Sequence, residues 1–176
     1  MLTTTYVLMA GLPGTGKSTL ADALARELNG VVLSKDAVRA ALFAGRLTDY
    51  SREQDDLCFR MVLDAAAYLA VHRRVEFIFL DGRTFSGREQ VNEAIGAAVA
   101  SGCEWKMLLT VCPEAVAEAR LVADKGSHPA ANRTVELYRE VRGRFEPIER
   151  PHLELETSRP MEECVKAALG YLRDRI

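Results

Sequence analysis

The feature that most constrains the fold is the glycine-rich segment GLPGTGKS at residues 11–18, because of the stretches on either side of it. It follows a short apolar run, Tyr6–Ala10, and leads directly into an amphipathic stretch at about residues 17–29. The apolar run predicts a strand and the amphipathic stretch predicts a helix, so the segment is a tight strand-to-helix turn. Such a turn begins a βαβ unit, which requires a parallel sheet with helices packed on its faces.

The same alternation of short apolar runs and amphipathic stretches continues to the end of the chain. The apolar runs predict strands at Tyr6–Ala10, Val31–Leu33, Phe77–Leu80, Met107–Val111 and Leu153–Leu155. Helices are predicted at about residues 17–29, 36–44, 51–73, 87–101, 113–124, 134–145 and 160–175. We therefore expect an α/β fold of three layers, with a five-stranded parallel sheet flanked by helices. Without a repeat or a linker, residues 1–176 are expected to form a single domain.

Residues 11–18 also match the pattern G-x-x-x-x-G-K-[ST], which is that of a P-loop. Glycines let successive backbone N–H groups converge on an anion, and the helix that follows directs its positive end to the same place. The lysine can reach the β- and γ-phosphates of a nucleotide, and the serine hydroxyl can ligate Mg²⁺. A guanine-specific N-K-x-D motif is absent, so ATP with Mg²⁺ is the expected ligand. The residues expected to bind it are Gly11, Leu12, Pro13, Gly14, Thr15, Gly16, Lys17, Ser18 and Thr19.

Composition restricts the remaining partners. The 176 residues are 48% hydrophobic and 27% charged, with a net charge of −2. An extensive nucleic-acid surface normally gives a basic protein, so a small molecule, or at most the end of a nucleic acid, is the expected partner. No apolar run reaches the length of about 18 residues that a membrane span needs, and the N-terminus lacks the pattern of a signal peptide. A cytoplasmic protein without membrane contact is expected, and its oligomeric state is not predicted.

Asp36 and Arg39 follow the second predicted strand, where the active sites of parallel sheets lie. Three residues apart, they share one face of the next helix. One interpretation is that Asp36 accepts the proton of a substrate hydroxyl while Arg39 steadies the substrate. The other is that Asp36 is simply the N-cap of the helix.

The third predicted strand ends at Asp81, within FLDGRTFSGREQ. An aspartate at this place can bind Mg²⁺ or can cap its own loop. Arg83 and Arg88 follow it, and each is expected either to bind the acceptor or to be solvated; Arg83 is the preferred candidate. The aromatic residues Phe43, Tyr50, Phe59 and Phe85 are interpreted mainly as core, although they could line an acceptor pocket.

These segments, together with VCPEAVAEAR, resemble the small P-loop kinases, a group that includes polynucleotide 5′-kinases, chloramphenicol phosphotransferase and zeta-toxin-like ATPases. The resemblance runs from about residue 5 to residue 158. It implies that Asp36 is the catalytic base, that Arg39 binds the acceptor side, and that Arg120 is the first arginine of a lid that clamps the transferring phosphate. It also implies adenine contacts from the backbone around residues 157–159.

The polar segment DKGSHPAANR, residues 124–133, is either this lid or an ordinary surface loop. The sequence departs from the resemblance here, because relatives commonly carry a second arginine a few residues after the first. Lys125, Arg133 or Arg142 are the candidates to replace it.

Three functional hypotheses follow from these patterns. The first is an ATP-dependent phosphotransferase, with Asp36, Lys17 and Arg120 as catalytic residues and a small hydroxyl-bearing acceptor. The second is a nucleotide or nucleic-acid 5′-end kinase, in which Arg39 or Arg83 binds a phosphate beside the reacting hydroxyl. The third is an ATP-hydrolysing switch without a small acceptor. The sequence does not identify the acceptor.

Overall fold

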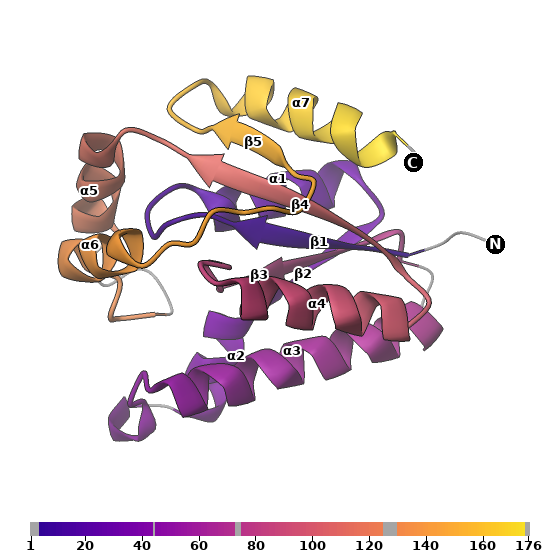
Figure 1. Cartoon of the computed structure of the whole chain (residues 1–176), viewed down its shortest axis with the longest axis horizontal. Coiled ribbons are helices and arrows are strands. Elements are labelled where there is room, and N and C mark those ends of the chain that lie inside the picture. Colours follow the sequence, from indigo (N-terminus) through magenta and orange to yellow (C-terminus); the bar gives the residue numbers. More distant parts are fainter. Residues whose placement is uncertain (1–3, 44, 73–74, 125–129, 175–176) are drawn as a thin grey trace.

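The computed structural model describes residues 4–43, 45–72, 75–124 and 130–174, and its centre is a parallel sheet (Figure 1). The strands are β1 (Thr5–Ala10), β2 (Gly30–Ser34), β3 (Phe77–Asp81), β4 (Glu104–Val111) and β5 (Leu153–Glu156). They form one five-stranded sheet in the order β2-β3-β1-β4-β5, and every pairing is parallel. The predicted α/β fold with a five-stranded parallel sheet is confirmed.

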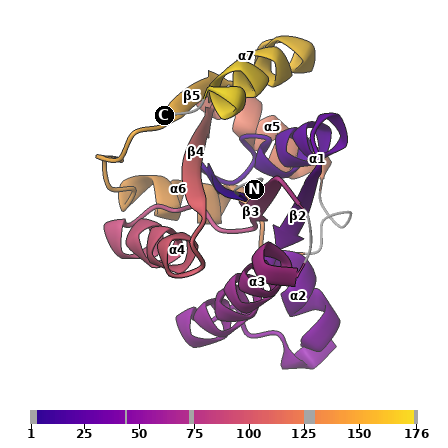
Figure 2. The same cartoon turned by 90° about the vertical axis from the view of Figure 1, so that its right-hand side faces the viewer.

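Helices cover both faces of this sheet and complete a three-layer structure. They are α1 (Lys17–Glu27), α2 (Lys35–Leu42), α3 (Arg52–His72), α4 (Arg88–Ala100), α5 (Glu114–Ala123), α6 (Val135–Gly143) and α7 (Met161–Arg173). Helices α1 and α7 pack on one face, and α3 and α4 pack on the other (Figure 2). Among the described residues, no helix combines the length and the apolar character that crossing a membrane requires.

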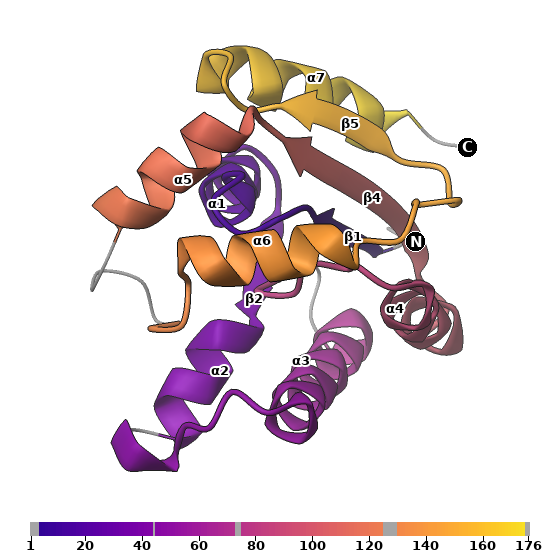
Figure 3. The ribbon, with the colours of Figure 1, turned by 60° about the vertical axis from the view of Figure 1, so that its left-hand side comes forward.

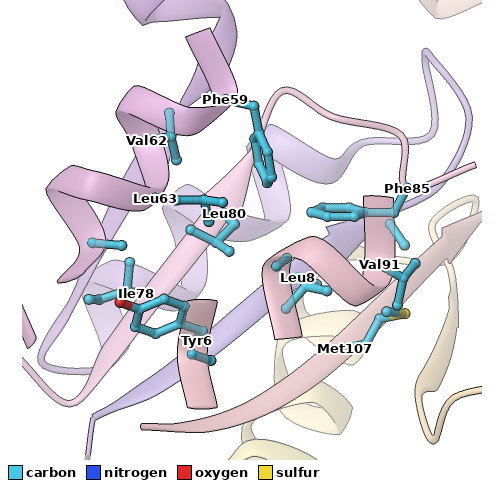
Figure 4. Packing of buried hydrophobic residues seen from close by; sticks show 14 residues of the cluster. Tyr6, Leu8, Phe59, Val62, Leu63, Ile78, Leu80, Phe85, Val91 and Met107 are labelled. Atoms are coloured by element: carbon cyan, nitrogen blue, oxygen red, sulfur yellow. The ribbon is translucent and has the colours of Figure 1, made fainter. Parts of the chain in front are cut away.

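The alternation of side chains along β1 builds two separate cores from one strand. Tyr6 and Leu8 face α3 and α4, where they pack with residues such as Phe59 and Met107 (Figure 4). Val7 and its alternate neighbours face α1 and α7 instead. Because successive side chains of a strand point to opposite faces, a central strand covered on both sides is expected to be mainly apolar, as β1 is from Tyr6 to Ala10.

The strands end toward α5 and α6, which stand beyond the carboxyl ends of the sheet (Figures 1 and 3). A small apolar cluster of Ala117, Leu121 and Tyr138 joins these two helices. The glycine-rich segment, the start of α2 and the loop after β3 all emerge at this same end. The fold therefore brings the predicted site segments to one edge of the sheet.

The structure differs from the predicted arrangement in two details, and one predicted segment is described only in part. A short 3-10 helix, η1 (Gly45–Leu47), connects α2 to α3. Strand β4 begins at Glu104, before the predicted Met107, because residues 104–106 pair with β1. The predicted lid segment, 124–133, includes residues 125–129, which lie outside the described residues, as does the candidate Lys125.

Lys106, an unexpected cation within β4, is only 4% exposed. Its Nζ donates hydrogen bonds to the carbonyl oxygens of Tyr171, at 2.6 Å, and of Asp174. These carbonyls lie at the C-terminal end of α7, where a cation also interacts favourably with the helix dipole. Lys106 therefore fastens the end of α7 to the sheet.

Replacing Lys106 by methionine is expected to lower the free energy of unfolding by about 1–3 kcal/mol, because two part-buried hydrogen bonds from the ammonium to carbonyl oxygens are lost. Urea unfolding followed by circular dichroism measures this change. Lys166→Met, on the exposed side of α7, is the control and should leave the midpoint unchanged. An unaltered midpoint for Lys106→Met would show that the end of α7 does not depend on this contact.

Candidate active site

The segment 11–18 forms a cradle in which glycine is required at two positions. Gly11 and Gly14 have φ angles of 137° and 79°, which L-residues rarely adopt. A Cβ on Gly11 would lie 2.4 Å from the carbonyl oxygen of Thr110, and one on Gly14 would lie 2.7 Å from that of Ala117. The backbone thus packs directly against β4 and α5, and side chains at these two positions would destroy the cradle.

Helix α1 begins at the end of this cradle. Its N-cap is Gly16, at φ 84°, which has no side chain to accept a hydrogen bond from the first-turn N–H groups. Those N–H groups, together with the positive end of the helix dipole, are available to an anion. The cradle therefore fits the phosphate chain that the sequence pattern predicts.

Lys17 lies at the base of the cradle, where its Nζ donates to the carbonyl oxygens of Gly11 and Leu12, both at 2.8 Å. Burial lowers the pKa of its ammonium to about 8, against the opposing effect of the Asp81 and Asp36 carboxylates; the guanidinium of Arg133 lowers it further. These interactions put Lys17 within electrostatic range of two carboxylates, one at the end of β3 and the other at the start of α2.

Ser18 and Asp81 bring together two oxygen donors of the kind that Mg²⁺ binds. The Ser18 hydroxyl donates to Oδ2 of Asp81 at 2.8 Å. Asp81 is 3% exposed, and its Oδ1 is buried without a hydrogen-bond partner among the described residues. A buried carboxylate oxygen without a partner is costly unless a cation or a donor satisfies it. Hard oxygen donors are also what Mg²⁺ prefers, so these two side chains fit the ion.

Asp36 and Arg39 lie together on the first turns of α2, as their spacing predicts. Arg39 Nη1 donates to Oδ1 of Asp36 at 3.2 Å, and Lys35 Nζ lies 3.6 Å from the same oxygen. The interpretation of Asp36 as the N-cap is wrong, because Ser34 holds that position and accepts from the N–H of Ala37. The Asp36 carboxylate is therefore held by two cations of its own helix, Lys35 and Arg39, and does not cap the N–H groups of that helix.

Asp55, at the start of α3, connects the cations of this region and was missed by the sequence analysis. It accepts from Lys35, from Arg39 Nη2 at 2.6 Å, and from Arg83 Nη2 at 3.1 Å. Burial raises the pKa of the Asp55 carboxyl, but the adjacent cations more than compensate, and the pKa lies below its usual value. One feature of the sequence could have indicated that Asp55 faces the protein. Asp55 precedes Phe59 by four residues and therefore lies on the same face of the helix as this buried ring.

Arg83 is 2% exposed, so the interpretation of a solvated side chain is wrong for it. Its guanidinium lies 4.2 Å from the ring centroid of Phe59 and pairs with Asp55, Asp56 and Glu93. Arg88, by contrast, is exposed and pairs with Glu149 on the surface. Arg83 is therefore a buried part of the cleft wall that holds α3 and α4 together through its carboxylate partners.

Arg120 lies at the edge of the cradle and is bound to the loop after β5. Its guanidinium donates to the hydroxyl of Thr157 at 3.1 Å and to the carbonyl oxygen of the same residue at 2.6 Å. The Thr157 hydroxyl in turn donates to the carbonyl oxygen of Thr15, at 2.7 Å. The loop for which the resemblance implies adenine contacts is thus joined to the glycine-rich segment through one threonine.

Of the three candidates for the missing second arginine, Arg133 is the one that lines the cleft among the described residues. Its Nη1 is 4.0 Å from Oδ2 of Asp124. Arg142 instead pairs with Glu114 and is largely exposed. The guanidinium of Arg133 also lowers the pKa of Lys17, so the two cations interact across the cleft that both line.

One cleft of about 1320 Å³ runs from the glycine-rich segment to α3 and α6. It is lined by the main charged and polar groups described above, which are Lys17, Ser18, Asp36, Arg39, Asp55, Asp81, Arg83, Arg120, Arg133 and Thr157. Tyr50 lies on its wall with an unusual positive φ of 54°. The guanidinium of Arg39 lies 5.2 Å from its ring centroid, and its hydroxyl accepts a hydrogen bond from the Ala131 N–H at 2.8 Å. Phe59 and Phe85 lie in the core, which confirms the core interpretation for those two rings.

Residues 7–148 match the model of a protein family described as an AAA domain. The chain belongs to this family. A search of curated proteins gave no significant match to this chain.

Solved structures share the fold of this AAA domain over almost its whole length. A protein from Chloroflexus aurantiacus is 22% identical over 98% of both chains, with a TM-score of 0.76. The APS kinase of Mycobacterium tuberculosis, solved with AMPPNP and APS, is 20% identical over 99% of this chain and 100% of its own, with a TM-score of 0.74. A gluconokinase from Sinorhizobium meliloti is 19% identical over 97% and 92% of the two chains, with a TM-score of 0.64. The predicted resemblance to small P-loop kinases is confirmed at the level of the fold.

Proposed function

We propose that the protein is an ATP-dependent phosphotransferase that moves the γ-phosphate to a hydroxyl group of a small acceptor. One observation carries the proposal: the phosphate cradle with Lys17 and the buried carboxylate of Asp36 line the same cleft. Lys17 is close enough to Asp36 for the two charges to interact. Phosphoryl transfer needs such positioned groups on both sides of the transferred phosphate.

At the nucleotide end, the N–H groups of the cradle and Lys17 would bind the β- and γ-phosphates. Ser18 and Asp81 would hold Mg²⁺, which neutralises charge on these phosphates when it is bound. Support comes from the shared fold with the Mycobacterium tuberculosis APS kinase, which was solved with the nucleotide AMPPNP. Arg120 and Arg133 lie at the sides of the cradle, where they would stabilise the negative charge of the transition state.

At the acceptor end, Asp36 orients the hydroxyl and accepts its proton. Arg39 fixes the carboxylate by donating to Oδ1, which leaves Oδ2 as the oxygen that a hydroxyl can approach. A 5′-end kinase would require Arg39 or Arg83 to bind a phosphate, but both already donate to Asp55. The small acceptor is therefore the better-supported alternative. An ATP-driven switch would have no need of Asp36.

ATP consumption, measured with Mg²⁺ across a library of hydroxyl-bearing metabolites, nucleosides and antibiotics, tests the proposal. Stimulation by an acceptor should disappear in both Lys17→Ala and Asp36→Asn. The exposed substitutions Lys166→Ala and Asp22→Asn are matched controls and should behave as the wild type. Turnover that ignores every acceptor and is lost only in Lys17→Ala would instead identify an ATP-hydrolysing switch.

The lowered pKa of Lys17 predicts a pH dependence of ATP use. Below pH 8 the side chain is cationic and binds the triphosphate, whereas above pH 8 the free protein holds a neutral amine. We therefore expect kcat/KM for ATP to be constant up to a pH of about 8 and then to fall by about tenfold for each further pH unit. Steady-state kinetics across this range measure the profile. A profile that stays flat well above pH 8 would contradict the assignment, and Lys17→Arg, which remains cationic, should shift or abolish the break.

A further inference from the structure

We infer that the acceptor is a small, uncharged molecule with several neighbouring hydroxyl groups, such as a sugar or a polyol. The inference rests on the proposed function, because it names the acceptor of that same reaction. It comes from the acceptor half of the cleft, by which we mean the part lined by α2, the start of α3, residues 81–90 and the end of α6. The decisive properties of this half are its charges and its aromatic surface.

The buried cations of the acceptor half already have carboxylate partners. Lys35 and Arg39 share Asp36 and Asp55, and both cations are less than a tenth exposed. Arg83 pairs with Asp55 and with two further carboxylates on α3 and α4. An anionic acceptor would have to take a cation away from such a pair and leave a buried carboxylate uncompensated.

The exposed cations at the rim of the acceptor half also have carboxylate partners. Arg52 Nη2 lies 3.2 Å from a carboxylate oxygen of Glu89, and Arg144 Nη1 lies 3.2 Å from one of Glu140. Arg88 pairs with Glu149, at 2.8 Å. Among the described residues, every lysine or arginine that lines this half therefore has an acidic partner, so that the wall attracts no anion by its net charge.

Arg39 shows why a phosphate or carboxylate group is a poor fit even beside a buried cation. Its two terminal nitrogens donate to Asp36 and Asp55, and its Nε is the one buried side-chain donor that lacks a partner among the described residues. Tight binding of a carboxylate or phosphate uses two parallel N–H groups of the guanidinium. Because the two terminal nitrogens are engaged and the Nε is buried, Arg39 offers no such pair of N–H groups to an acceptor.

Aromatic acceptors find no stacking platform in the acceptor half. Among the described residues that line the cleft, Tyr50 supplies the one aromatic ring. That ring lies against the guanidinium of Arg39, and its hydroxyl is bonded to Ala131. Recognition of a nucleobase commonly uses an accessible aromatic face.

A polyhydroxylated acceptor matches what the wall does offer. Carboxylates that are paired on one side still have free lone pairs, and hydroxyl groups can donate to one side chain while accepting from its neighbour. Asp36, Asp55 and Asp56 supply such acceptors beside the donors that they pair with. Paired acidic and basic side chains therefore suit neighbouring hydroxyls better than they suit a charged group.

The transfer itself balances without a further reactant. One acceptor hydroxyl oxygen forms a bond to the γ-phosphorus while the bond from that phosphorus to the β–γ bridging oxygen breaks. ADP leaves with the electron pair of the broken bond. The hydroxyl proton passes to Oδ2 of Asp36 and from there to solvent.

The experiment uses the wild-type chain and sorts acceptors by charge before any is identified. A cell extract is freed of protein and divided by ion-exchange resins into neutral, anionic and cationic pools of small molecules. Each pool is added to the protein with ATP and Mg²⁺, and ADP formation is measured. Half of each pool is first treated with periodate, which cleaves vicinal diols, and the excess reagent is then quenched.

We expect stimulation by the neutral pool, loss of that stimulation after periodate treatment, and loss in Asp36→Asn. Stimulation confined to the anionic or cationic pool, and absent in Asp36→Asn, would overturn the inference while leaving the proposed function standing. Stimulation by the neutral pool that survives periodate would overturn the vicinal polyol in the same way. The absence of Asp36-dependent stimulation by any pool would overturn both the inference and the proposed function.

Discussion

Replacing Asp36 by asparagine is expected to lower the rate of phosphoryl transfer by about 10²- to 10⁴-fold, the range that a positioned acid–base group contributes. The substitution keeps the size of the side chain and its place between Lys35 and Arg39. It removes the oxygen that accepts the proton of the hydroxyl. The affinity for ATP, which depends on the cradle around Lys17, should change little. Steady-state kcat and nucleotide binding by calorimetry measure the two effects separately.

Asp22→Asn provides the matched control, because Asp22 is an exposed carboxylate on α1. It makes the same chemical change outside the cleft and should leave kcat and ATP affinity as they are. An Asp36→Asn protein with full transfer activity would remove Asp36 from the mechanism. A protein that lost ATP binding as well would indicate that Asp36 shapes the nucleotide end.

Replacing Asp55 by asparagine is expected to lower the free energy of unfolding by about 3 kcal/mol. Lys35, Arg39 and Arg83 would then lose the carboxylate that they share. Removing one partner of a buried ion pair costs about 3–5 kcal/mol, and the lower end applies because a quarter of the Asp55 side chain is exposed. Urea unfolding at neutral pH measures the loss. Because Arg39 also fixes Asp36, the KM for the acceptor should rise in the same variant.

The pH dependence of this loss gives an independent check. The folded state lowers the pKa of Asp55, so its contribution is present above the unfolded pKa of about 4 and is lost as the pH falls below it. The difference between Asp55→Asn and the wild type should therefore shrink in acid. Asp64→Asn, an exposed position on the same helix, should show no difference at either pH. A constant difference across pH would mean that Asp55 acts through packing and not through its charge.

The pattern of apolar residues was enough to predict the sheet, because the strands contain short, mainly apolar runs, whereas the helices show apolar residues at helical spacing. Each predicted strand corresponds to an observed one. The start of β4 was missed because Glu104 and Lys106 interrupt its apolar pattern. Lys106 is buried all the same, since its ammonium reaches the carbonyls at the end of α7, a contact across the fold that no local pattern reveals.

The nucleotide end and the acceptor end of the candidate site differ in how far they could be predicted. The cradle is one continuous segment whose glycines have a local physical reason, so its pattern was recognisable without a structure. The acceptor end depends on Asp55, whose partners lie 16, 20 and 28 residues away. Two adjacent aspartates at the start of a long helix are typical of a solvated surface. Their partial burial arises only when α2, α3 and the loop after β3 pack together.

Tyr50 couples two parts of the cleft, because it contacts both Arg39 on α2 and the backbone of Ala131 before α6. It has a backbone conformation that L-residues rarely adopt, while its ring lies against Arg39 and its hydroxyl is bonded to the backbone of Ala131, just before α6. Such conformations persist only where surrounding contacts impose them. A ligand that fixes Arg39 therefore also favours one position of the chain at Ala131, and the reverse is equally true. Thermodynamic reciprocity then requires that two ligands bound at the two ends change each other's affinity by the same factor.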